Sequence, residues 1–185
     1  MKKEIFVLIP LAVILFSCSE SAKSPIGPTF RGLEWGTDIK KMENMVYVKT
    51  VKNVIACYRK EKENLEIGDA SVQYILYNFR EGKLVGVYIR FADLSNFKKF
   101  KKMLFYKYGS TEENYKKLSN ISDEGWSVKY IWEGTDVTIV LYFNRSACDY
   151  TSGSGGYDPD YNSGGGEIEY YTKSRKKLKK GLNEL

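Results

Sequence analysis

The sequence predicts an α+β fold in which helices pack on one face of a single antiparallel sheet. Apolar and polar side chains alternate along several segments, which is the pattern of strands with one buried face. Residues 95–108 instead carry apolar side chains three and four apart, the spacing of an amphipathic helix. No segment demands a parallel strand. The chain has 185 residues, of which 15% are aromatic, enough for one domain with a packed core.

The domain is expected to open with a short helix and a strand region. Thr37 or Asp38 can cap a helix that ends near residue 44, by accepting a hydrogen bond from a free backbone N–H in the first turn. Residues 46–59 are rich in β-branched side chains and predict one or two strands, and residues 60–69 form a charged turn region.

The clearest strands form a hairpin over residues 72–79 and 84–91. Gly82 lies between them and can adopt the positive φ that such a turn needs. The amphipathic helix over residues 95–108 follows, and Gly109 is placed to cap its C-terminal end. The first half of the domain is therefore predicted to be a hairpin followed by a helix.

The second half repeats this order without repeating the sequence. Strands are expected over residues 126–132 and 137–143, joined by a turn at residues 133–136. A glycine-rich loop covers residues 151–166 and a last strand residues 167–173. Ser174 can then cap a final basic helix that ends near Leu182. We therefore expect two hairpin-plus-helix halves on one sheet.

Residues 1–17 have the composition of an export signal. Lys2 and Lys3 give a positive start, and residues 5–16 are uncharged and apolar. As a helix this apolar run would cover about 18 Å, less than the ~30 Å hydrocarbon core of a bilayer. Pro10 would also disturb a permanent transmembrane helix. The segment therefore predicts a secretory signal peptide rather than a membrane span.

The end of this segment, Leu15-Phe16-Ser17-Cys18, resembles the lipobox of bacterial lipoprotein precursors. The resemblance implies that Cys18 receives a diacylglyceryl thioether, that the signal is cut before it, and that the new amino group is acylated. Ser19 stands where an aspartate commonly retains such proteins in the inner membrane, so the resemblance implies the outer membrane in a Gram-negative cell. The alternative is an ordinary signal peptide, cut after residues 19–21, that releases a soluble periplasmic protein.

This reading divides the chain into three parts. Residues 1–17 are the signal peptide, residues 18–29 a lipidated flexible tether rich in Ser, Pro and Gly, and residues 30–185 a single α+β domain. Several acyl chains on one residue would hold the domain at a membrane surface for long periods, whereas one chain binds only marginally.

Short motifs of the domain are similar to those of small bacterial envelope proteins that have no assigned activity. The motifs are Phe30-Arg31-Gly32 with Trp35-Gly36, Gly82-Lys83-Leu84 with Gly86-Val87, and Tyr108-Gly109. The resemblance covers about residues 30–145 and implies a fold rather than a function.

The absence of histidine narrows the chemistry. A Ser-His-Asp or Cys-His hydrolase site cannot be built without it, and neither can a zinc site with histidine ligands. Paired carboxylates and Ser-Lys pairs remain open. We expect no catalytic residue, no cofactor and no metal.

Cys57 and Cys148 are the cysteines that remain after lipidation of Cys18. An exported domain lies in an oxidising compartment, which favours a disulfide between them. The alternative is two buried thiols that act as small hydrophobic side chains.

Three further patterns do not point to a specific function. Oxygen ligands alternate from Asp158 towards Glu169 as in a calcium loop, but Ser163 stands where that loop needs glycine, so a surface loop is favoured. The basic run over residues 173–180 and the lysines of residues 98–107 are more typical of solvated helix faces than of a lipid-binding surface. The aromatic residues Trp126, Tyr130, Trp132 and Tyr142 favour strand packing over a ligand surface.

The function predicted from these patterns is a non-enzymatic envelope lipoprotein. Its anchor would hold one small domain at the membrane, where the domain binds an envelope protein or polymer; nucleic acid is not an expected partner. The alternatives are an envelope enzyme that uses carboxylates or a Ser-Lys pair, and a module that binds anionic lipid or lipopolysaccharide.

Overall fold

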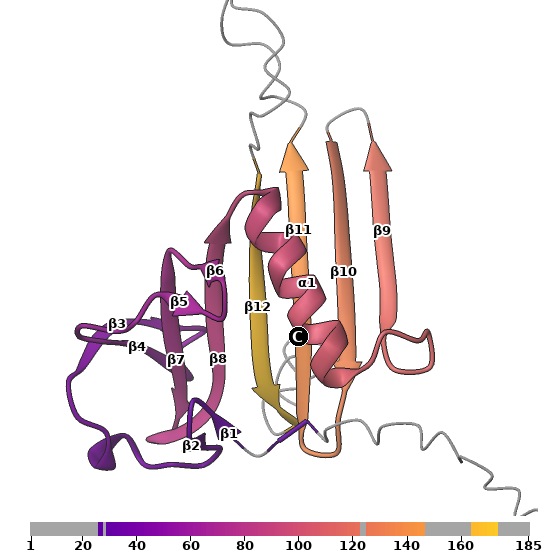
Figure 1. Ribbon diagram of the computed structural model, residues 1–185. Coiled ribbons are helices and arrows are strands. Elements are labelled where there is room, and N and C mark those ends of the chain that lie inside the picture. The colour runs from indigo at the N-terminus through magenta and orange to yellow at the C-terminus, as the bar shows by residue number, and fades with distance from the viewer. Residues whose placement is uncertain (1–25, 28, 123–124, 147–163, 174–185) are drawn as a thin grey trace, which may run out of the picture.

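The computed structural model describes residues 26–27, 29–122, 125–146 and 164–173. Within these ranges, eight strands form one antiparallel sheet in the order β3-β4-β7-β8-β12-β11-β10-β9 (Figure 1). The strands are β3 (Met45–Val51), β4 (Ile55–Lys60), β7 (Tyr74–Arg80), β8 (Lys83–Ala92), β9 (Lys116–Ser122), β10 (Gly125–Glu133), β11 (Val137–Ser146) and β12 (Gly165–Thr172). Two short hairpins stand beside the sheet: β1 (Thr29–Phe30) with β2 (Leu33–Glu34), and β5 (Glu66–Ile67) with β6 (Ala70–Ser71).

Helix α1 (Leu94–Tyr108) lies across β12, β11 and β10 on one face of this sheet (Figure 1). It begins at Asp93, whose Oδ1 accepts a hydrogen bond from the backbone N of Asn96 at 2.8 Å. It ends at Gly109, which has φ +97° and donates its N–H to the carbonyl of Phe105 at 2.9 Å. The predictions of a helix over residues 95–108 and of its glycine cap are confirmed.

The core lies between α1 and the sheet. The buried face of α1 consists of Phe97, Phe100, Leu104 and Tyr108. It packs on strand residues that alternate into the same face, such as Ile139 and Leu141 of β11, which are fully buried. Trp132 of β10 is 1% exposed, and its Nε1 donates to the carbonyl of Gly109 at 3.2 Å. This bond ties the end of the helix to the sheet beneath it.

The predicted fold class is wrong, because the protein is mostly β. The described residues contain one α-helix against an eight-stranded antiparallel sheet. Instead of a helix up to residue 44, a single 3-10 turn spans Ile39–Lys41. The carboxylate of Asp38 caps this turn by accepting from the N–H of Lys40 at 2.9 Å, but Met42 is already extended and ends it. The final helix predicted from Ser174 to Leu182 lies outside the described residues.

The predicted division into two hairpin-plus-helix halves is also wrong. Strand β12 pairs with β8 on one side and with β11 on the other, so the last strand joins both halves into one sheet. Strand β9, which has no strand pattern in the sequence, adds an edge beside β10. At the other end, the sheet twists until β3 and β4 run nearly across the direction of β9–β12 in Figure 1.

Candidate functional site

Arg59 and Tyr74 occupy the end of β4 and the beginning of β7, on the sheet face opposite α1. Their chain neighbours define this orientation, because side chains alternate along a strand. Tyr58 pairs with Tyr77 on the core side, and Ile75 is 2% exposed. Arg59 and Tyr74 therefore point to the other side, where Tyr74 is 42% exposed.

Two hollows of similar size meet at these two side chains. The first, of about 430 Å³, is lined by Arg59, Lys60, Glu61, Lys62, Glu63, Leu65, Gln73, Tyr74 and Ile75. The second, of about 450 Å³, is lined by Val46, Tyr47, Val48, Lys49, Arg59, Tyr74 and Leu76. We call the pair the Arg59–Tyr74 groove. Each hollow is within the size range of ligand pockets, ~300–1,000 Å³.

The lining of the groove combines apolar and basic side chains. Four basic side chains line the two hollows, namely Lys49, Arg59, Lys60 and Lys62, against the carboxylates of Glu61 and Glu63. Glu63 is already paired within the protein, as described below. The groove is therefore suited to a ligand that carries negative charge beside an apolar or planar group.

Tyr74 is held in place by a stack of side chains behind it. Its ring stacks on Tyr88 of β8, with ring centroids 6.0 Å apart and an interplanar angle of 26°. The hydroxyl of Tyr88 donates to Oε2 of Glu167 at 2.6 Å, and Arg90 lies 3.9 Å from the same oxygen. Burial, and then the hydrogen bond to Glu167, raise the pKa of Tyr88. The ring of Tyr74 is thus a positioned, partly exposed platform at the groove.

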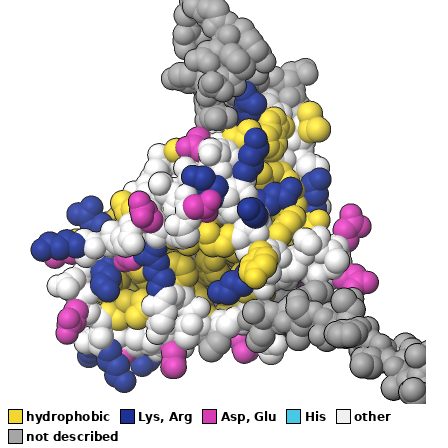
Figure 2. Space-filling view, viewed as in Figure 1, with side chains coloured by type: hydrophobic (Ala, Val, Ile, Leu, Met, Phe, Trp, Pro, Cys, Tyr) yellow, Lys and Arg dark blue, Asp and Glu magenta, His cyan; other side chains and the backbone are white. Residues whose placement is uncertain are grey.

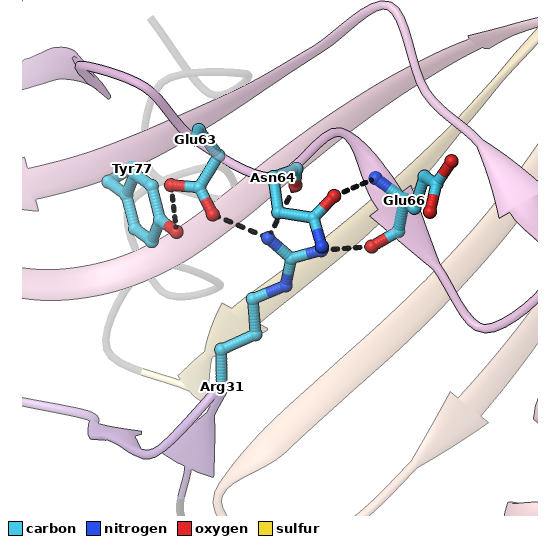
Figure 3. A network of polar contacts seen from close by, with 5 residues as sticks. All are labelled: Arg31, Glu63, Asn64, Glu66 and Tyr77. Carbon is cyan, nitrogen blue, oxygen red and sulfur yellow. Dashed lines mark hydrogen bonds and ion pairs between the residues drawn. The ribbon is translucent and has the colours of Figure 1, made fainter.

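A network centred on Arg31 fixes the loop that walls the first hollow (Figure 3). Arg31 reaches from the β1–β2 turn and donates to Oε1 of Glu63 at 2.5 Å. It also donates to the backbone carbonyls of Asn64 at 2.8 Å and Glu66 at 2.6 Å. The hydroxyl of the buried Tyr77 donates to Oε2 of Glu63 at 2.9 Å. Burial, and then the charge of Glu63, raise the pKa of Tyr77.

Basic side chains are also distributed along α1 and around the end formed by β3 and β4 (Figure 2). Three lysines of α1 have partners within the domain: Lys99 donates to the carbonyl of Asp69, Lys101 lies over the rings of Phe105 and Tyr130, and Lys107 lies over Tyr108. The outermost stripe of α1 is Lys98, Lys102 and Tyr106, all exposed, with Tyr106 at 94%.

The packing role predicted for the four aromatic residues is confirmed, and three of them pack on the core face of the sheet. Tyr130 and Trp132 are buried, and Trp126 packs against Phe143 with ring centroids 5.4 Å apart. Tyr142 also packs across the strands, but on the opposite face of the sheet, where the ammonium group of its paired residue Lys129 lies 5.5 Å from its ring.

Of the predicted site residues, the structure describes Cys57. It is buried in β4 beside Ile55 and Val85. Cys148 and Cys18 lie outside the described residues, so the disulfide and the lipidation site stay predictions. The acidic loop residues 158–163 also lie outside them, while Glu169 is part of β12. Among the described residues, no three metal-ligating side chains form a cluster.

The groove could not be predicted from the sequence. The local patterns place residues 60–69 in a charged turn and Tyr74 in a hairpin strand, and nothing in them connects the two. The basic run at Arg59, Lys60 and Lys62 was the available signal, but its meaning depends on the pairing of β4 with β7.

Within the described residues, α1 is too short and too polar to cross a bilayer, and no other described helix is long enough. Comparisons with protein-family models, with curated proteins and with solved structures find no match to this chain.

Proposed function

We propose that this protein is a membrane-anchored binding module of the bacterial cell envelope, which holds its partner at the Arg59–Tyr74 groove. The anchor is proposed at Cys18, on the sequence of residues 15–18. The observation that supports binding is that the two hollows adjoin at one positioned aromatic ring and one arginine. Exposed aromatic and arginine side chains are the residue types that dominate binding surfaces.

The path of the chain is consistent with this arrangement. Ile26 packs at the β10–β11 turn, where a Cβ on Gly134 would lie 2.9 Å from the Cβ of Ile26. The tether therefore meets the sheet near β10 and β11, at least five strand positions from β3. At the usual strand spacing this is roughly 24 Å. The groove lies near the far edge of the sheet and stays accessible to a partner in the envelope.

Site-specific photo-crosslinking in intact cells tests the proposal. A photoreactive phenylalanine analogue replaces Leu65, which lines the groove and is 39% exposed. The matched control replaces Leu118, which is 57% exposed on β9 at the opposite edge. We expect a discrete adduct from position 65 that Arg59→Glu reduces, and none from position 118. No adduct at either position, or equal adducts at both, would contradict a groove-based partner.

A second function, binding to anionic lipid, is favoured by the outer stripe of α1. Lys98, Lys102 and Tyr106 place two cations and an exposed tyrosine on one helix face. Each basic residue near an anionic bilayer contributes ~1 kcal/mol, and this attraction falls with salt. Salt-sensitive binding to anionic vesicles that K98E/K102E weakens would support this function. Vesicle binding that neither salt nor the two substitutions change would rule it out.

A further inference from the structure

Strand β3 forms one edge of the sheet and exposes apolar side chains. Among the described strands it pairs with β4 alone. Tyr47, Val48 and Val51 are 54%, 43% and 39% exposed. An edge strand presents backbone donors and acceptors that another extended chain can pair with. The opposite edge, β9, also exposes two apolar side chains, Leu118 and Ile121, but it opens with Lys116 and Lys117, and edge lysines commonly guard against such pairing.

The same end of the molecule carries most of the net charge of the chain. Residues 40–62, which span β3 and β4, contain seven basic residues and two acidic residues, or +5, against +6 for the whole sequence. The basic side chains around β3 and β4 are visible in Figure 2. Such a local excess attracts acidic partners and disfavours a second copy of the same positive surface.

The groove continues this edge onto the sheet face. Val46 and Lys49 of β3 line the second hollow together with Arg59 and Leu76. A strand added beside β3 would lie about 4.8 Å from it, and every second side chain would point to the face that carries Lys49 and Arg59. Backbone pairing would supply affinity, and the basic side chains of the groove would select the alternate side chains of the added strand.

We propose that β3 accepts an extended acidic peptide segment of the partner as an added strand, with alternate carboxylates directed towards Lys49 and Arg59. This inference rests on the proposed function, because it assigns a binding mode and a chemical class to the partner of that groove. The register irregularity between Tyr47 and Lys49 divides β3 into two short runs, so the added strand pairs over only a few residues.

The test uses the mature protein in detergent and a fluorescent peptide of about eight alternating valine and glutamate residues, a typical strand length. A valine–lysine peptide of equal length is the charge control. Two further peptides carry backbone N-methyl groups on alternate residues, one peptide on its valines and the other on its glutamates. Only alternate residues of an added strand bond to its neighbour, so one N-methylated peptide should bind and the other should not.

K49E/R59E should lower the affinity for the acidic peptide about tenfold, since each changes the sign of a charge at the added strand. K116E/K117E, the same charge change on β9, should alter it less than about twofold, because β9 lies at the opposite edge of the sheet from β3, well beyond the screening length of salt. Binding of both N-methylated peptides, binding of the valine–lysine peptide, or no binding of the acidic peptide would overturn the inference.

This outcome is separable from that of the proposed function. A groove adduct in cells together with failure of the peptide assay would leave the binding module in place and remove the strand-addition mode. Peptide binding without a groove adduct in cells would support strand addition at β3 and remove the cellular role assigned to the groove.

Discussion

Removing the carboxylate of Glu63 should destabilise the protein, because the buried hydroxyl of Tyr77 then loses its hydrogen-bond acceptor. The hydroxyl of Tyr77 donates to this carboxylate at 2.9 Å, and Tyr77 is 1% exposed. Glu63→Ala leaves that buried donor without an acceptor, which costs about 1–3 kcal/mol. It also removes the ion pair with Arg31, worth about 1 kcal/mol at a partly exposed pair. We expect a total loss of about 3 kcal/mol in the free energy of unfolding.

Tyr77→Phe alone should cost only about 1 kcal/mol, because Glu63 keeps its bond to Arg31. The double variant has no hydroxyl left without an acceptor. Its loss in the free energy of unfolding should therefore be smaller than the sum of the two single losses by about 1 kcal/mol or more. Urea unfolding of the four proteins at neutral pH measures this coupling. Additivity within about 0.5 kcal/mol, with unchanged denaturant dependence, would show that the bond between the two side chains contributes nothing.

Three further outcomes follow from the packing and from the pKa shifts. Burial raises the pKa of Tyr77 and Tyr88, so the folded state keeps protons that the unfolded chain loses above pH about 10. The free energy of unfolding should therefore fall as the pH rises past that point, and it should fall less in Tyr77→Phe. Denaturant titrations at several pH values measure both effects. Gly166→Ala should cost roughly 1–3 kcal/mol in chemical denaturation, because its Cβ would lie 2.6 Å from the carbonyl oxygen of Tyr142; a wild-type midpoint would refute that close approach. Asp93→Ala should cost about 1 kcal/mol in thermal unfolding through loss of the α1 cap, while Asp93→Asn, which keeps the acceptor oxygen, should cost much less; equal losses would exclude a capping role.

The elements that the sequence predicted well are those whose pattern is local. The hairpin of β7 and β8 shows alternation around a glycine turn, and α1 combines a helical period with Gly109. Strand β9 has no such signal, because its sequence is mostly polar and its two apolar residues, Leu118 and Ile121, are exposed. It exists as a strand because β10 offers an edge to pair with.

The sequence failed to predict the features of the fold that depend on contacts between distant segments. Nothing near residues 165–172 indicates that this segment inserts between β8 and β11, since that position is decided by which edges remain open. The helix content was overestimated because Asp38 is a good cap whose helix does not continue past one turn. The groove was not predicted for the same reason as the position of β12 in the sheet: Arg59 and Tyr74 become neighbours only when β4 pairs with β7. The proposed anchor, in contrast, is a purely local signal in residues 15–18.

The most direct test of a membrane-anchored module is mass spectrometry of the N-terminal peptide of the mature protein, purified from cell membranes. We predict a first residue of Cys18 that carries a diacylglyceryl thioether and an acylated amino group, and we predict that Cys18→Ala releases the domain from the membrane. A mature chain that begins at another residue, or that carries no fatty acyl chains, would contradict a lipid anchor at Cys18.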